Sequence, residues 1–164
     1  MQAIAQTSAA PAAPPQRLER IRFCSRCATT TAEPEPHPLP YGFDRVCGRC
    51  GMGVMLSAAR RALPDSGAAF LVVTREGSIS AVSESAEALV GDEAGLLGMP
   101  VTTAVTSPTG DAHLVRSLAR AACGDRDVVE IAVSSAAKAG PLGARVTSCG
   151  PPRAALLVLE RTPR

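Results

Sequence analysis

The hydrophobic pattern from residue 68 onward predicts a mixed domain of strands and helices. Short apolar runs, several with alternating polarity and most ended by a Gly or Pro turn, are typical of strands. Between the second and third runs the apolar positions recur at helical spacing, most clearly over 111–122. The expected strands are 68–74, 78–83, 127–135, 142–150 and 153–161. We therefore predict an α+β fold, with a five-stranded antiparallel sheet and helices on one face.

Shorter helical segments are expected as well. Ser83 can cap a helix over 84–90, and Gly91 can end it. The segment 92–105 is interrupted by Gly95 and Gly98, so we expect it to be helical only in pieces. The run MLSAARRAL at 55–63 predicts one more short helix, ended by the Pro-Asp-Ser-Gly sequence that follows it.

The chain before residue 55 differs from the rest in composition and periodicity. Residues 1–16 are rich in Ala, Pro and Gln and show no periodicity, which predicts a disordered tail. Residues 17–54 contain four paired cysteines and a Pro-rich loop with almost no apolar core. The predicted organisation is a tail (1–16), a zinc ribbon (17–54), a helical linker (55–67) and an α+β domain (68–164).

The paired cysteines are the strongest chemical signal in the sequence. They form a C-x2-C-x19-C-x2-C pattern, whose spacing is typical of zinc ribbons; the predicted ligands are Cys24, Cys27, Cys47 and Cys50. Gly48 and Gly51 suit the tight turn of the second pair. Four thiolates fill a tetrahedral shell, so we expect a structural Zn2+ with no open position, and His37 outside the shell. A rubredoxin-type iron is the competing metal, whereas disulfides are disfavoured in a reducing cytosol.

Residues 69–160 resemble a PAS domain. The hairpin Phe70–Gly77 with Ser78–Ser83, the helix Glu84–Gly91 and the segment Leu96–Val101 resemble the start of that family, and a long helix with three strands completes its order. The resemblance implies a sensory or protein-interaction module that can hold a small ligand. It also implies that a homodimer could form through this domain.

The residues argue against haem and flavin as that ligand. On the helix 111–122, His113 lies opposite the face predicted to be apolar, which carries Leu114, Val115, Leu118 and Ala122. The Asn-Cys-Arg motif of flavin photosensors of the PAS family is missing. Cys123 and Cys149 stand alone, and their role is open.

Charge and aromatic content limit the class of partner. The net charge is +2, but residues 17–61 contain eight arginines against four acidic residues; four thiolates with one Zn2+ would reduce that formal +4 to +2. Aromatic residues make up only 2%, which leaves few rings for stacking on bases. We expect a protein partner, with nucleic acid as the alternative; the candidate contacts are Arg17, Arg20, Arg22, Arg26, Arg45 and Arg49.

The sequence predicts a regulatory protein rather than an enzyme. It has no Gly-x-Ser-x-Gly nucleophile elbow and no phosphate-binding P-loop. No apolar run approaches the ~18 residues of a membrane span, and the first residues lack the features of a signal peptide, so we expect a cytoplasmic protein. The leading hypothesis is a zinc ribbon joined to a PAS-like domain in signalling or transcription regulation. A nucleic-acid-binding ribbon and a thiol redox sensor remain alternatives.

Overall fold

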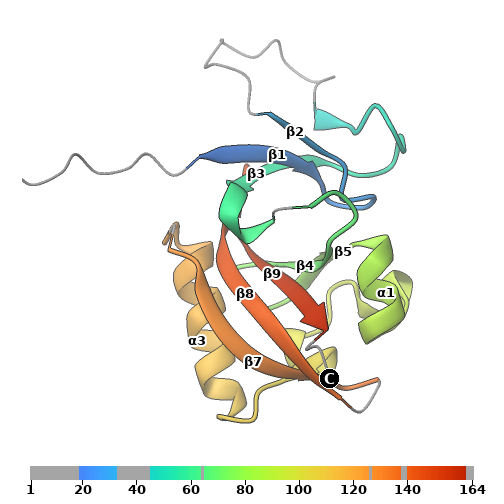
Figure 1. Ribbon diagram of the computed structural model, residues 1–164. Coiled ribbons are helices and arrows are strands. Elements are labelled where there is room, and N and C mark those ends of the chain that lie inside the picture. The colour runs from blue at the N-terminus through green and yellow to red at the C-terminus, as the bar shows by residue number, and fades with distance from the viewer. Residues whose placement is uncertain (1–18, 33–44, 64, 126, 138–139, 162–164) are drawn as a thin grey trace, which may run out of the picture.

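The computed structural model describes residues 19–32, 45–63, 65–125, 127–137 and 140–161 (Figure 1). Within these ranges nine strands join one antiparallel sheet and a few short helices pack against it. The strands are β1 (Arg20–Cys24), β2 (Thr30–Ala32), β3 (Met55–Ala59), β4 (Ala69–Val73), β5 (Ile79–Val82), β6 (Val105–Thr106), β7 (Val129–Ser135), β8 (Pro141–Gly150) and β9 (Ala154–Arg161). The helices are α1 (Glu84–Val90), α2 (Glu93–Leu96) and α3 (Asp111–Ala122), with 3-10 turns η2 (Arg60–Ala62) and η3 (Val101–Thr103).

The sheet joins the cysteine-rich segment to the rest of the chain. Its strand order is β2-β1-β3-β8-β9-β4-β5, and β7 pairs with β8 and β6. Because β8 is ten residues long, one of its edges serves two neighbours: β7 pairs along residues 141–146, and β3 pairs where Ser57 meets Gly150 and Ala58 meets Cys149. Figure 1 shows β1–β3 above the strands and helices of the C-terminal part.

Two apolar cores lie on opposite faces of the central strands. In β9, alternate side chains point to opposite faces: Ala155, Leu157 and Leu159 belong to a core shared with the helices, whereas Leu156 and Val158 belong to a second core shared with β1 and β3. Strand β4 divides in the same way. Burial on both faces therefore explains the almost continuous apolar run of β9.

The second core closes around an aromatic pair. Phe23 of β1 and Phe70 of β4 are both fully buried, with ring centroids 5.2 Å apart and an interplanar angle of 83°. Such an edge-to-face pair adds about 0.5–1.5 kcal/mol beyond the burial of its area. This face of β4 and β9 is therefore covered by the chain's own strands β1 and β3.

Most elements predicted from residue 68 onward are confirmed. Helix α3 has the predicted bounds, and Ser83 caps α1 through its side chain, which accepts a hydrogen bond from the amide of Ala86. Gly91 ends that helix with φ at +113°. The segment 92–105 is helical in pieces, as predicted.

The helix predicted over 55–63 is wrong. Residues 55–59 form strand β3, and only Arg60–Ala62 make a 3-10 turn. An isolated helix of nine residues is marginal in water. Here β3 instead pairs along its whole length with β1, which is a tertiary contact that periodicity does not show.

Two further predictions need correction or fall outside the described residues. On α3, Val115 is 40% exposed and Ala121 is buried in its place, although His113 is exposed as predicted. The tail 1–16, Arg17 and His37 lie outside the described residues.

Candidate metal centre

Two hairpin-like turns, which we call knuckles, bring the four cysteines together. The first knuckle, Cys24–Ala28, follows directly from the buried strand β1. The second knuckle, Cys47–Gly51, is enclosed by an antiparallel bridge between Val46 and Val54. Backbone hydrogen bonds close each turn: the amide of Ala28 donates to Cys24 O at 3.2 Å, and that of Gly51 donates to Cys47 O at 2.9 Å.

The sulfur atoms have the spacing of a tetrahedral metal site. All four Sγ atoms lie within 4.8 Å of one another. The Sγ atoms of Cys24 and Cys50 are 3.6 Å apart, and those of Cys27 and Cys47 are 3.8 Å apart. A tetrahedron with metal–sulfur bonds of ~2.3 Å has sulfur–sulfur edges of about 3.8 Å. The cluster predicted from the sequence is therefore formed, and it could hold one metal ion.

Backbone amides point at the sulfurs and favour their charged form. The amides of Arg26 and Cys27 donate to Cys24 Sγ at 3.4 and 3.5 Å, and that of Gly53 donates to Cys50 Sγ at 3.4 Å. Hydrogen bonds from the amides of Met52 and Gly53 lower the pKa of Cys50 to about 6.

Burial acts in the opposite direction on Cys24, which lies deeper in the fold. Removal from solvent raises the pKa of Cys24 to about 12. A bound dication would offset the cost of ionising the buried Cys24 thiol, because metal ligation requires the thiolate and releases its proton. The cluster is thus asymmetric: the pKa values of Cys27 and Cys50 are lowered, whereas the pKa of Cys24 is raised.

Glycine is required at a position that the sequence analysis did not identify. A Cβ on Gly53 would lie 2.2 Å from Cys24 Sγ and 2.9 Å from the amide nitrogen of Arg26, so only glycine fits. Gly51 has φ at +68°, as expected for the predicted turn, whereas Gly48 has open space around it and no positive φ. Gly53 lies outside the C-x2-C pattern, so the motif gives no signal for it.

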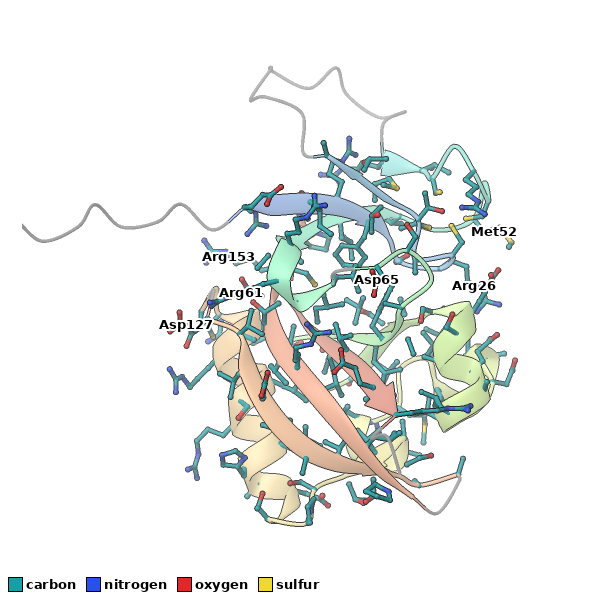
Figure 2. The ribbon with its side chains drawn as sticks, viewed as in Figure 1. Arg26, Met52, Arg61, Asp65, Asp127 and Arg153 are labelled. Carbon is teal, nitrogen blue, oxygen red and sulfur yellow. The ribbon has the colours of Figure 1, made fainter. Side chains whose placement is uncertain are left out.

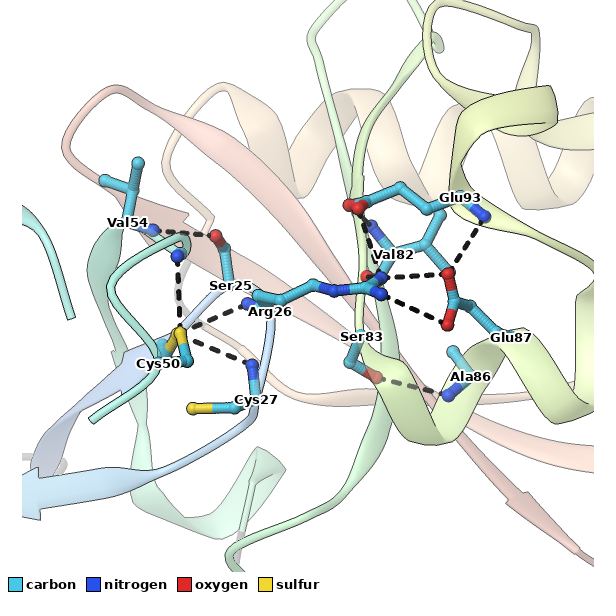
Figure 3. A network of polar contacts seen from close by, with 12 residues as sticks. Ser25, Arg26, Cys27, Cys50, Val54, Val82, Ser83, Ala86, Glu87 and Glu93 are labelled. Carbon is cyan, nitrogen blue, oxygen red and sulfur yellow. Dashed lines mark hydrogen bonds and ion pairs between the residues drawn. The ribbon is translucent and has the colours of Figure 1, made fainter.

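Arg26, between the first two cysteines, connects the first knuckle to the helices (Figure 3). Its guanidinium pairs with Glu87 of α1 through two hydrogen bonds, at 2.9 and 3.3 Å, and with Glu93 of α2 at 3.1 Å. Its carbonyl accepts a hydrogen bond from the amide of Glu84 at 3.0 Å, where α1 begins. The first knuckle is therefore attached to α1 through both its main chain and its side chain.

The carboxylates of this network are themselves held in place. Glu93 accepts a hydrogen bond from the amide of Val82 at 3.1 Å and donates its own amide to Glu87 at 3.1 Å. The hydrogen bond from Arg26 is the largest influence on Glu87 and holds the pKa of that carboxyl below its ordinary value of 4.5. The sequence makes Arg26 a candidate contact for an external partner, but its guanidinium forms ion pairs with Glu87 and Glu93 of the same chain.

The other candidate arginines occupy different surroundings. Arg20 and Arg22 are half-buried on β1, and Arg20 donates to Ser57 O at 3.1 Å. Arg45 and Arg49 are exposed beside the second knuckle, and Arg49 donates to Thr29 Oγ1 at 3.2 Å. Of the candidates that the structure describes, these two are the ones that present an exposed side chain.

The two remaining cysteines lie outside the cluster. Cys149 is buried in the core between β8 and the N-terminal strands, and burial raises its pKa to about 12. Cys123 is exposed directly after α3.

No helix among the described residues is long and apolar enough to cross a membrane. Neither a protein-family model nor a curated protein sequence matches the chain.

Proposed function

We propose that this chain is a non-enzymatic regulatory protein. In this proposal a structural Zn2+ holds the cysteine-rich ribbon together, and the ribbon is coupled to a PAS-like sensory or protein-interaction domain in signalling or transcription regulation. The order hairpin, helices, long helix and three strands supports the PAS-like assignment. All-sulfur ligation supports zinc over harder metals such as Mg2+ or Ca2+.

The observation that carries the proposal is the attachment of the first knuckle to α1 and α2 through Arg26. A ribbon that served only as an independent appendage would not need a bidentate ion pair from the metal-binding turn to the neighbouring domain. The connection instead gives a route by which the state of the metal centre and the position of the helices affect each other.

The first test is the composition of the full-length protein as purified. Elemental analysis should give one zinc per chain, and the visible absorption spectrum should be blank. One iron per chain with thiolate-to-iron absorption bands would contradict structural zinc. A Soret or flavin band would show that the α+β domain holds a chromophore that its sequence did not disclose.

The regulatory part needs its own test. Zinc-loaded full-length protein should co-purify with a stoichiometric protein partner from its source cells, and the Arg26→Ala variant should recover less of it while keeping its zinc. Turnover of a small molecule by the isolated, zinc-loaded chain would contradict a non-enzymatic role.

A thiol redox sensor is a second candidate, favoured by one observation. Cys27 and Cys50 are partly exposed, so peroxide can reach their sulfurs. One peroxide would oxidise two thiolates to a disulfide, release the metal and be reduced to two waters with uptake of two protons. Zinc release at micromolar peroxide, reversed by a thiol reductant, is the expected result. Zinc retained at millimolar peroxide would contradict it.

A further inference from the structure

Exposed apolar side chains gather around the second knuckle. We call residues 45–54 the knuckle tip. Within it Val46 is 53% exposed, Met52 71% and Val54 42%, and Met52 lies at the outer margin of the molecule in Figure 2. Single exposed apolar residues are ordinary on protein surfaces, but three within nine residues on one small hairpin are not.

The main chain of the knuckle tip is fixed on several sides. Val46 and Val54 are bridge partners, so their side chains leave the same face of the hairpin. Ser25 of the first knuckle donates its amide to Val54 O at 2.9 Å and accepts from the amide of Val54 through its hydroxyl at 3.0 Å. The amide of Cys47 donates to Gly53 O at 2.8 Å. Because the main chain is already held in this way, it needs little further ordering when the tip binds a partner.

The charged side chains within the knuckle tip itself are arginines. Residues 45–54 contain two arginines and no acidic residue. Both arginines are exposed, whereas Cys24 and Cys47 are buried and the sulfurs of Cys24 and Cys50 accept backbone hydrogen bonds. The two arginines are therefore more exposed than the four cysteines, of which two are buried and two are partly exposed. Met and Arg are both enriched in protein interfaces, where Arg pairs well with carboxylates.

We propose that the knuckle tip is a protein-docking surface for a short segment that presents apolar side chains flanked by carboxylates. The apolar side chains of the partner cover Met52, Val46 and Val54, and its carboxylates pair with Arg45 and Arg49. This inference rests on the proposed function, because a metal bound between the two knuckles would add to the hydrogen bonds that hold the tip in shape. Nucleic acid fits less well, since the tip has no aromatic ring to stack on a base and its centre is apolar.

The probe for this proposal is a library of random dodecapeptides displayed on phage. Selection is performed on the zinc-loaded full-length chain, with counter-selection on the Met52→Ser/Val54→Ser double variant. We expect enriched peptides in which apolar residues alternate with Asp or Glu. Synthetic versions should bind the double variant at least tenfold more weakly and Arg45→Glu roughly three- to tenfold more weakly. The matched control is Leu97→Ser/Met99→Ser, which removes two apolar side chains exposed elsewhere and should leave binding unchanged.

Several outcomes would overturn the proposal. They are the absence of peptides whose binding depends on the tip, enriched peptides without carboxylates, and self-association of the chain that Met52→Ser abolishes. Oligonucleotide binding that is lost in Arg45→Glu but kept in Met52→Ser would also overturn it. Zinc content is measured for every protein used. If the wild-type chain carries no zinc, the proposed function itself fails; if it carries zinc but binds no peptide through the tip, only the docking proposal fails.

Discussion

The two knuckles each contribute two cysteine sulfurs to the cluster but lie in different environments. The first follows a buried strand, contains the deeply placed Cys24 and is joined to α1 and α2 by Arg26. Around the cysteines of the second, Arg45, Val46, Arg49, Met52 and Val54 are exposed. The cysteine cluster thus joins a turn that is built into the fold to a turn that is exposed at the surface.

The comparison extends to the residue after each second cysteine. Ala28 of the first knuckle and Gly51 of the second both have positive φ, at 55° and 68°. Alanine in this region costs about 1 kcal/mol relative to glycine. In the first knuckle the methyl group of Ala28 is buried in the core shared with β1, which offsets this conformational cost. The second knuckle is exposed at this position and has Gly51 instead.

Metal removal should have the largest effect on the stability of the fold, because it removes the link between the two knuckles. Structural zinc contributes on the order of 10 kcal/mol of binding free energy, much of which stabilises the fold. Treatment of the full-length protein with a strong chelator should lower the midpoint of thermal unfolding by roughly 10–20 °C. The control is the same chelator already saturated with zinc. An unchanged midpoint after verified metal loss would contradict a structural role.

The Gly53→Ala substitution should have the next largest effect. The added methyl would overlap with Cys24 Sγ, so the second knuckle would have to move away from the first. We expect the affinity for zinc to fall by about 100-fold, or about 2.7 kcal/mol, measured by competition with a chromophoric chelator. Gly48→Ala, where nothing lies within 4 Å of the added atom, is the matched control and should leave the affinity unchanged. Equal losses in both variants would refute the steric explanation.

The Arg26→Ala substitution should have a moderate effect that Arg49→Ala lacks. Arg26 is 22% exposed and pairs with two carboxylates, so its loss should cost about 1–2 kcal/mol of unfolding free energy while zinc stays bound. Arg49 is exposed on the second knuckle, and its loss should change the unfolding free energy by less than about 0.5 kcal/mol. Denaturant unfolding checks both variants. Indistinguishable variants would mean that the two knuckles are coupled to the domain to the same extent.

The smallest effect concerns the titration of Glu87. Because its pKa in the folded state is lowered, the carboxylate stabilises the fold above its ordinary pKa of 4.5, and this contribution is lost as the pH falls through the lowered value. Carbon-detected NMR titration should place the pKa of Glu87 below 4.5 in the wild-type protein and closer to 4.5 in Arg26→Met. The same pKa in both proteins would show that the ion pair does not form in solution.

The sequence predicted local features better than contacts between distant segments. The cluster of four cysteines followed from their spacing alone, and α3 followed from its apolar periodicity and the residues that flank it. Strand β3 was missed because its partners, β1 and β8, lie about 35 and 90 residues away along the chain. Pairing over such distances leaves no mark in the local hydrophobic pattern.

The same limit applies to the candidate site. The role of Gly53 depends on an atom of Cys24 nearly thirty residues earlier, and the role of Arg26 depends on carboxylates about sixty residues later. Arg26 and Arg49 occupy comparable places between paired cysteines, so the sequence could not tell which of them is held within the molecule and which is exposed.

Hydrogen–deuterium exchange tests the central claim most directly, namely that the metal centre and the α+β domain are coupled through the first knuckle. Exchange is measured by mass spectrometry on the full-length protein with zinc and after chelation, in the wild type and in Arg26→Ala. The account predicts that metal removal speeds exchange both in 20–59 and in α1 and α2, and that Arg26→Ala speeds exchange in α1 and α2 while zinc remains bound. Faster exchange confined to 20–59 after metal removal, with no change in the helices of Arg26→Ala, would contradict it.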